Sequence, residues 1–480
     1  MPLIVAGLCT STALLMTCCK LKARQLSASV AWSWVAAGLV SSAFGLAQYF
    51  GASADFSPWI NPSRYGEAFA NLRQRNQFVT LTNIALTAVV WLVTQMQAPV
   101  KVVKHWTAIR LWLAFVAAGL LMVGSAISSS RTGFFELSLL CVLFALWGLW
   151  RLALVRWILA WSVAVYCIAV FAMPYLAGLD LSKFGVAARL RQDDACGSRL
   201  ILWSNVLHLI AQKPWLGWGW SELDYAHFIT LYNSPRFCDI LDNAHNLPLH
   251  LAVELGVPIA LLVCGGFVWW VWHQKPWAER DATRQMAWAV IAVILLHSML
   301  EYPLWYGPFQ MAFGSCILLL WRQKQPSDAK NSAEKVSNRP LALVLYASAA
   351  IISIAFIVYA MWDYRRVSQI YLQPESRDAH YRSDTLNKIR SSWLFADQVR
   401  FAELMITPLS PANASWTFSS AKALLHYSPE PRVIEKLIES AVMLGRDDEA
   451  MAYLARYRVA FPKEHVLWAK ANATSNAKSN

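Results

Sequence analysis

The segment 242–258, DNAHNLPLHLAVELGVP, holds the side chains best suited to moving a proton. His245 carries an imidazole, which titrates near neutral pH and can take a proton from a hydroxyl group and pass it on. Asn246 follows directly and could orient either the imidazole or a substrate. His250 and Glu254 are four residues apart and so share one face of a helix. That face suits a polar site or a buried hydrogen-bonded pair, and we favour the buried pair for His250.

Two arginines offer planar cations that suit phosphate. Arg131 lies in SSSRTGFFEL (128–137), and Arg199 opens the stretch GSRLILWSNVLHLI (197–210). A guanidinium stays charged and presents a fork of N–H groups that matches phosphate oxygens. The alternatives are a snorkelling interfacial cation for Arg131 and a solvated helix-start residue for Arg199.

A fourth group of polar and aromatic residues lies in HSMLEYPLWYGPFQ (297–310). His297 and Glu301 are again four residues apart, and Pro303 ends the helix that carries them. The aromatic residues could form a rim that stacks on sugar rings, or a plain interfacial belt. These aromatic residues are Tyr302, Trp305 and Tyr306.

Several motifs of other enzyme classes are absent from the sequence. It contains no GxxxxGK[ST] loop, no DxD-type carboxylate pair in the loops predicted to be external, and no Cys/His metal spacing. Basic residues do not cluster with aromatics in a soluble domain, which argues against nucleic-acid binding. We therefore expect neither a metal nor a cofactor, and no nucleotide hydrolysis.

Composition indicates the kind of protein that must position these groups. Of 480 residues, 57% are hydrophobic and only 15% are charged, against about 45–50% and about 25% in soluble domains. The formal net charge is +13. In a membrane protein such an excess indicates the positive-inside bias. A disordered chain and a single soluble enzyme are both excluded, and a polytopic α-helical membrane protein is predicted.

Ten segments are apolar enough, or nearly so, to cross a bilayer, which takes about 20 apolar residues. The segments are 2–19, 30–50, 77–96, 107–127, 134–150, 157–176, 247–271, 286–300, 307–321 and 340–361. The pair 286–300 and 307–321 is short, and could be two tight spans or a broken helix lining a polar cavity.

Charge in the connections predicts the orientation of these spans. Alternate connections hold sixteen Lys and Arg residues, whereas the short connections of the other set, 51–76, 128–133 and 301–306, hold four. The positive-inside rule then places 177–246 and 363–480 on the non-cytoplasmic side. In this arrangement the first span starts outside, which predicts that a further helix precedes it or that translation starts elsewhere.

Four regions follow from this reading: N-terminal spans (1–176), an external loop (177–246), C-terminal spans (247–362) and a soluble tail (363–480). The loop contains an amphipathic stretch, Leu200 to Ile210, and a turn after it. The tryptophans of both suit a helix and turn at the lipid interface; they are Trp203, Trp215, Trp218 and Trp220. The tail reads as helices, including either one tetratricopeptide-like repeat or an ordinary helical hairpin. Cys196 and Cys238 share the external loop, where an oxidising compartment would permit a disulfide bond.

The motifs resemble those of a known superfamily, the bacterial O-antigen ligases, O-antigen polymerases and O-oligosaccharyltransferases. His245 and Asn246, followed by nine residues and Gly256, match the ligase-type motif His-Asn-x9-Gly, although Ile259 replaces its second glycine. SSSRTG is similar to the superfamily's Ser-Arg-x-Gly segment. FANLRQRNQFVTL (69–81), with Gln74 and Asn76, and the segment 297–314 resemble the two signatures of the protein-glycosylating branch.

The resemblance implies an O-linked oligosaccharyltransferase of the bacterial inner membrane. It would move a glycan from undecaprenyl diphosphate to a Ser or Thr hydroxyl of a periplasmic acceptor protein such as a pilin. The implied fold is all-α and polytopic, with about ten transmembrane helices, a large periplasmic loop and a helical C-terminal periplasmic domain. The alternatives are a ligase acting on lipid A–core, a Wzy-type polymerase and, in a different class, a lipid or glycan transporter.

The combined reading assigns His245 as the catalytic base. The imidazole and the two guanidinium groups are expected to converge on a lipid diphosphate at the outer leaflet. The candidate substrate-binding residues are Arg131, Arg199, Asn246, Gln74, Asn76, Glu254, His297, Glu301, Tyr302 and Tyr306.

Overall fold

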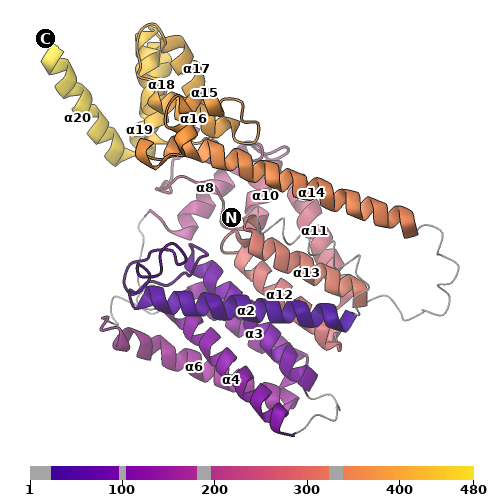
Figure 1. Cartoon of the computed structure of the whole chain (residues 1–480). Coiled ribbons are helices and arrows are strands. Elements are labelled where there is room, and N and C mark those ends of the chain that lie inside the picture. Colours follow the sequence, from indigo (N-terminus) through magenta and orange to yellow (C-terminus); the bar gives the residue numbers. More distant parts are fainter. Residues whose placement is uncertain (1–22, 97–103, 181–195, 324–338, 480) are drawn as a thin grey trace. The chain divides into compact units, whose positions relative to one another are not determined.

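The computed structural model describes residues 23–96, 104–180, 196–323 and 339–479, which form helices joined by loops (Figure 1). No β-strand occurs in this described part of the chain, in agreement with the predicted all-α class. The chain separates into two compact units, each built from two stretches of sequence. The first comprises residues 1–193 and 269–353, and the second comprises residues 194–268 and 354–480.

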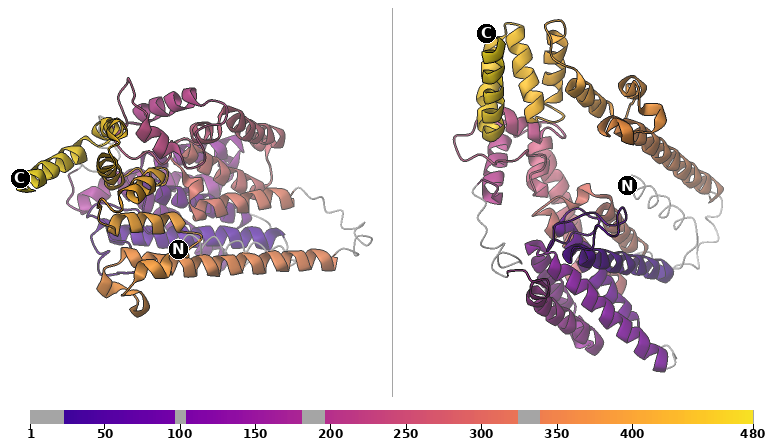
Figure 2. Two further views of the ribbon diagram at one scale, coloured as in Figure 1. Left: turned by 90° about the horizontal axis from the view of Figure 1, so that it is seen from above. Right: turned by 60° about the vertical axis from the view of Figure 1, so that its left-hand side comes forward.

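The first unit is a bundle of apolar helices around a central one. Helix α3 packs against α2, α4, α5 and α12, and 83% of its most apolar stretch is buried. Small residues allow this close packing: a Cβ on Gly38 of α2 would lie 2.5 Å from the Cβ of Ala85 of α3. The helices of this unit are α2 (Ala23–Tyr49), α3 (Arg75–Met96), α4 (Lys104–Ile127), α5 (Arg131–Leu146), α6 (Ala153–Leu176), α12 (Ala282–Ser298) and α13 (Gly307–Gln323). The indigo and purple helices α2, α3 and α4 lie side by side in all views (Figures 1 and 2).

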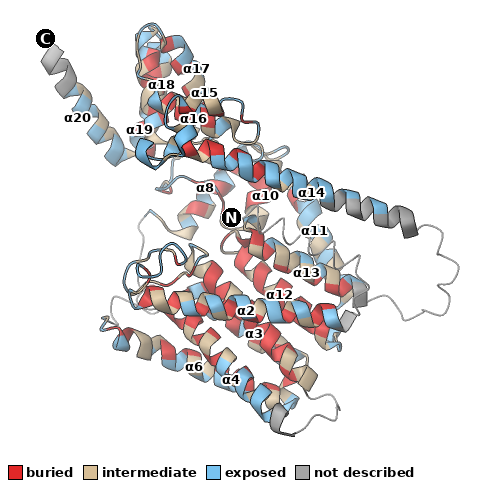
Figure 3. Cartoon of the chain, viewed as in Figure 1, coloured by how far each residue is buried: buried red, intermediate tan, exposed pale blue. Residues whose placement is uncertain are grey.

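Among the residues that the structure describes, five helices are long and apolar enough to cross a membrane: α2, α3, α4, α6 and the helix that begins at Val257. Helices α12 and α13 are apolar but shorter. The predicted span 340–361 falls within α14 (Arg339–Ser368), and 134–150 corresponds to α5 with the short helix η1 (Leu149–Arg151). The predicted span 2–19 lies outside the described residues. In Figure 3 α3 and α12 are largely red, or buried, whereas α11 and α14 are largely pale blue, as expected for helices that face lipid.

The predicted span 247–271 is two helices rather than one. Helix α10 (Leu247–Leu255) ends at Gly256, whose φ of +88° interrupts the helix, and α11 (Val257–Gln274) begins directly after it. Hydropathy cannot reveal this break, because both sides of Gly256 are equally apolar.

Hydrogen bonds in the first unit group the connections by their charge. At one end, Gln74 and Asn76 bond to Glu301, which joins two of the cation-poor connections. At the other end, the Trp147 indole donates to the Pro276 carbonyl at 2.7 Å, next to cation-rich connections. Each of these two bonds thus lies between segments that the charge pattern assigns to the same side.

The second unit joins the predicted external loop to the C-terminal tail through one hydrophobic core. Phe228 of α9 is 2% exposed and packs among buried residues of the tail helices, including Phe401, Phe418 and Leu437. Arg456 of α19 also donates to the carbonyl of Ile229 at 2.8 Å. The further helices of this unit are α8 (Arg199–Gln212), α9 (Leu223–Ile229), α15 (Thr385–Ile389), α16 (Ala396–Ile406), α17 (Ala414–Leu424), α18 (Pro431–Met443), α19 (Asp447–Ala460) and α20 (Pro462–Ser479).

Helices α18 and α19 form the predicted helical hairpin of the tail. They pack against each other, and the turn between them contains Gly445. Gly445 has a φ of +67°, the left-handed conformation that commonly ends a helix. Because α9 contributes to the same core, the loop and the tail form one packed body rather than two separate regions.

Candidate active site

His245 lies directly before the N-terminus of α10 in an unusual backbone conformation. Its φ is +51°, in the left-handed region that few residues other than glycine adopt. The conformation is held by the side-chain oxygen of Asn243, which accepts from the backbone N–H of His245 at 2.9 Å. Asn246 then caps α10 by accepting from the N–H of Leu249 at 3.1 Å. Strained backbone of this kind is concentrated at functional sites.

His250 and Glu254, predicted to share a helix face, form a buried pair behind His245. Their side chains are 3% and 2% exposed, and His250 Nε2 lies 3.4 Å from Glu254 Oε2. The other ring nitrogen, Nδ1, accepts a long hydrogen bond of 3.5 Å from the N–H of Ala244. Because Nδ1 accepts, a neutral His250 carries its proton on Nε2, facing the carboxylate. The pair thus connects the body of α10 to the residue that precedes His245.

Gly256, the glycine of the His-Asn-x9-Gly pattern, allows a tight turn to pack on the break between α10 and α11. A Cβ at Gly256 would lie 2.2 Å from the carbonyl oxygen of Trp215, and one at Gly217 would lie 2.3 Å from that of Glu254. Three backbone hydrogen bonds join the two segments, including one of 2.8 Å from Val257 to Pro214. This contact fixes α10, and therefore the residues at its N-terminus, against the turn that follows α8.

Arg131 and Arg199 occupy equivalent local positions in two different helices. Each is the first residue of its helix, α5 or α8, and each follows a serine cap. Ser130 accepts from the N–H of Gly133 at 3.2 Å, and Ser198 accepts from that of Ile201 at 3.3 Å. Helix N-termini favour anions, and an arginine adds a formal positive charge there. Arg131 belongs to the first unit, whereas Arg199 and His245 belong to the second.

The structure joins Gln74, Asn76 and Glu301 into one hydrogen-bonded group. The two carboxylate oxygens of Glu301 accept from Gln74 at 3.2 Å and from Asn76 at 3.1 Å. Asn76 in turn accepts from the hydroxyl of Ser130 at 2.6 Å. Ser130 caps the helix that begins at Arg131. Glu301 is therefore connected, through the side chains of Asn76 and Ser130, to the first turn of that helix.

A second buried group, only partly foreseen from the sequence, lies among α3, α5 and α12. The Thr80 hydroxyl lies 2.8 Å from His297 Nδ1 and 2.5 Å from a carboxylate oxygen of Glu136. The other oxygen of Glu136 accepts from Asn83 at 2.8 Å. These four side chains are fully buried. Sequence reasoning named only His297, although the polar stripe along an apolar helix was a usable signal. That stripe consists of Asn76, Thr80, Asn83 and Thr87.

The predicted aromatic rim is present beside Glu301. Tyr302 and Tyr306 stack with ring centroids 5.8 Å apart, and Trp305 is 39% exposed. Aromatic faces of this kind can contact the apolar faces of sugars, and the phenol groups can donate hydrogen bonds.

Cys196 and Cys238 form a disulfide bond, with their Cα atoms 5.4 Å apart. This bond ties the residues just before α8 to the loop that leads to His245. Within the described residues, no group of three or more His, Cys, Asp or Glu side chains is arranged to hold a metal ion.

Three protein families match consecutive parts of the chain. Protein glycosylation ligase matches residues 68–93, and O-antigen ligase matches residues 113–264. The C-terminal part of the virulence factor membrane-bound polymerases matches residues 285–476. The first range contains Asn76, the second contains Arg131 and His245, and the third contains Glu301. Consecutive parts of the chain are therefore similar to protein glycosylation ligases, to O-antigen ligases and to membrane-bound polymerases.

The chain is also similar to two O-oligosaccharyltransferases. The chain is similar to the general O-oligosaccharyltransferase of Acinetobacter baylyi, with 22% identity over 270 residues, or 55% of this chain and 45% of the relative. It is also similar to the ComP-specific O-oligosaccharyltransferase of that organism, with 22% identity over 286 residues, or 59% and 49% of the two chains. The chain thus spans about half the length of these curated relatives. No solved structure matches it significantly.

Proposed function

We propose that this protein is an O-linked oligosaccharyltransferase. It transfers a glycan from undecaprenyl diphosphate to a Ser or Thr hydroxyl of a periplasmic protein such as a pilin, and its active site faces the periplasm of a bacterial inner membrane. The bond from the sugar to the acceptor oxygen forms as the bond from the sugar to the diphosphate breaks. The acceptor proton passes to a base, and the lipid diphosphate leaves as an anion.

The observation that carries this proposal is the strained backbone of His245 at the N-terminus of α10. A left-handed histidine between a buried asparagine and a helix cap is costly, and such strain indicates a side chain held for chemistry. We assign His245 as the base that takes the hydroxyl proton, a contribution of about 10²–10⁴-fold. Asn246 shapes its backbone as the helix cap. The buried Glu254, proposed from sequence as a substrate ligand, acts instead through His250 by positioning the His245 segment.

Arg131 and Arg199 suit the diphosphate. Each combines a guanidinium with the N–H groups of a Ser-capped helix N-terminus, and both features favour phosphate oxygens. Stabilising the charge that develops on the leaving diphosphate is usually the larger catalytic contribution. Departure of the lipid diphosphate also drives the reaction, so that no nucleotide is required.

The hydrogen-bonded group around Glu301 then has a positioning role. Glu301 orients Asn76, which accepts from the serine that caps the helix of Arg131. Gln74 donates to the second carboxylate oxygen of Glu301. The buried His297 lies deeper among the helices and supports the same arrangement through Thr80. Tyr302 and Tyr306, which are only partly buried, are the residues we assign to the glycan.

The proposal is tested by co-expressing the protein with a lipid-linked glycan and a candidate pilin, followed by intact-mass measurement of the pilin. Wild-type protein should add the mass of the glycan, and His245→Ala should abolish this addition. His208→Ala is the matched control, because His208 is an exposed histidine of α8. An unchanged pilin mass with wild-type protein, or a His245→Ala variant as active as the control, would contradict the proposal.

A second candidate function is ligation to lipid A–core or polymerisation of O-antigen. The matches to O-antigen ligase and to the membrane-bound polymerase favour it. The match to protein glycosylation ligase and the aromatic segment beside Glu301 favour protein acceptors. Offering a pilin and core lipopolysaccharide to the same cells separates the two, because only the accepted substrate gains glycan mass.

A further inference from the structure

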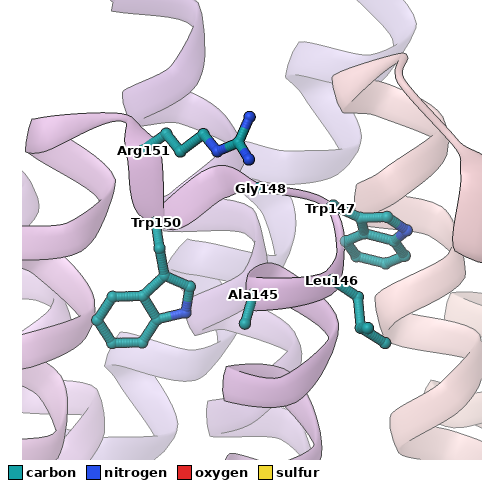
Figure 4. Close-up of a pocket in the computed structure, with 6 residues that line it drawn as sticks. All are labelled: Ala145, Leu146, Trp147, Gly148, Trp150 and Arg151. Atoms are coloured by element: carbon teal, nitrogen blue, oxygen red, sulfur yellow. The ribbon is translucent and has the colours of Figure 1, made fainter.

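A hollow of about 440 Å³ lies at the other end of the first unit, on the turn that joins α5 to α6 (Figure 4). It plays no part in the proposed transfer reaction. Its polar and aromatic lining consists of Trp147, Trp150 and Arg151. Gly148, at φ +72°, makes the turn, and Leu149 anchors it in the bundle, where this leucine is 9% exposed.

The two indoles in this hollow are held by hydrogen bonds of their own N–H groups. Trp147 donates to the Pro276 carbonyl at 2.7 Å, and Trp150 donates to the Cys141 carbonyl at 3.4 Å. Because both N–H groups are used, each indole is fixed with its ring, rather than its donor, available to a ligand. Fixed aromatic rings beside a cation suit a ligand that has both apolar and anionic parts.

Arg151 is the charged group of the hollow. Its Cδ lies 4.0 Å from where a Cβ on Gly148 would be, and Figure 4 shows the guanidinium extending across the turn. Within the described residues, the Arg151 side chain forms no ion pair and no hydrogen bond. A guanidinium that has no partner in a concave, aromatic-lined site is placed to bind an anion.

The position of the hollow identifies the kind of anion. Trp147 contacts Pro276, so that the turn lies at the cation-rich end of the helices, which the positive-inside rule assigns to the cytoplasmic face. Tryptophan and arginine beside the ends of apolar helices lie at the level of lipid headgroups. Basic pockets between transmembrane helices on this face bind the headgroups of anionic lipids.

We propose that the hollow formed by Trp147, Trp150 and Arg151 binds the phosphate of an anionic phospholipid from the inner leaflet. The guanidinium would pair with the phosphate, and the indole rings would contact the glycerol and upper acyl chains. The site is separate from the groups assigned to catalysis and does not depend on the proposed transferase activity.

Native mass spectrometry of the full-length protein in neutral detergent tests this site. Phosphatidylglycerol should be retained about fivefold or more in preference to phosphatidylcholine, and Arg151→Gln should remove about that factor. Arg151→Lys should give an intermediate result, because it keeps the charge but loses the fork. Arg156→Gln is the matched control, since Arg156 is an exposed arginine five residues further on that does not line the hollow.

Three results would overturn the proposal. Equal retention of the two lipids by wild-type protein would show that the hollow has no headgroup preference, and this measurement does not depend on any variant folding. Equal losses in Arg151→Gln and Arg156→Gln would show only a general effect of charge at the membrane surface. Displacement of phosphatidylglycerol by inorganic phosphate at the same concentration would show a simple anion site.

Discussion

Asn76 and Glu301 are joined by a hydrogen bond of 3.1 Å between Nδ2 and Oε1, although 225 residues separate them in the sequence. The same carboxylate accepts from Gln74, and Asn76 accepts from the serine that caps the helix of Arg131. This relationship brings together two segments that resemble signatures of protein-glycosylating enzymes. It also gives a structural reason for their polar residues, which lie at the ends of otherwise apolar helices.

We expect Glu301→Ala to lower both stability and transfer. Glu301 is 4% exposed, and its removal leaves the half-buried amides of Gln74 and Asn76 without this acceptor, at a cost of up to about 1 kcal/mol for each hydrogen bond. Thermal unfolding in detergent and glycan transfer to a pilin measure the two effects. Glu375→Ala, at an exposed glutamate, is the control. If Glu301→Ala matched that control in both measurements, the positioning role would be wrong.

Gly256→Ala should prevent correct packing of the break between α10 and α11. Alanine at φ +88° is strained, and its Cβ would lie 2.2 Å from the Trp215 carbonyl oxygen, where backbone rather than a flexible side chain must move. We expect the free energy of unfolding to fall by about 2–5 kcal/mol. The yield of folded protein in size-exclusion chromatography should fall as a result.

Gly265→Ala is the matched control for this substitution. Gly265 lies within α11, and nothing lies within 4 Å of where its Cβ would be. Alanine there should be neutral or stabilising by up to about 1 kcal/mol, because glycine is the poorer helix former. Similar yields for the two variants would contradict the tight approach of the 214–219 turn.

Much of this architecture could be predicted from sequence because it depends on local periodicity and charge. Long apolar runs predicted the helices, whereas the orientation that Lys and Arg indicate stays a prediction. Both Asn76 and Glu301 were identified as site residues, but no local pattern states that they touch each other. Long-range pairing depends on how the helices cross, and a single sequence does not contain that information directly.

Other features were missed for identifiable physical reasons. The break at Gly256 results from a backbone torsion angle, which hydropathy does not reveal. Glu136 lies one turn after Arg131 in an apolar helix, and its burial against Thr80 and Asn83 depends on the packing of α5 on α3. The shared core of loop and tail depends on Phe228, a single aromatic residue in a short helix whose partners lie about 170 to 230 residues further along the chain.

Asp224 of α9 predicts a dependence of stability on pH. Burial, together with the nearby carboxylates Glu222 and Asp242, raises the pKa of Asp224 to about 7. A carboxyl whose pKa is raised in the folded state stabilises the fold when protonated. Its contribution is complete at pH values below the ordinary carboxyl pKa, and is lost as the pH rises through about 7.

Asp224→Asn should therefore become more stable relative to wild type as the pH rises from about 5 to about 8. Thermal unfolding of the full chain at several pH values measures this difference. Asp239→Asn is the control, because Asp239 is an exposed aspartate of the same unit. A constant difference between Asp224→Asn and wild type across the pH range would show that Asp224 does not titrate as its surroundings indicate.

Arg131→Ala should reduce transfer at least as much as His245→Ala. The base contributes about 10²–10⁴-fold, whereas stabilisation of the leaving diphosphate is usually the larger effect in a site shielded from water. Arg131→Lys should fall between wild type and Arg131→Ala, because lysine keeps the charge but loses the planar fork. Initial rates of transfer from lipid-linked glycan to a purified pilin measure these differences.

Arg156→Ala separates the role of this particular guanidinium from the effect of losing any cation. Arg156 is exposed and belongs to the cation-rich end of the helices, so that its removal should leave the rate within about twofold of wild type. An Arg131→Ala variant that folds normally and retains near-normal transfer would show that Arg131 does not bind the diphosphate. The serine cap and the Asn76–Glu301 hydrogen bond would then serve only to pack α5 against α3 and α12.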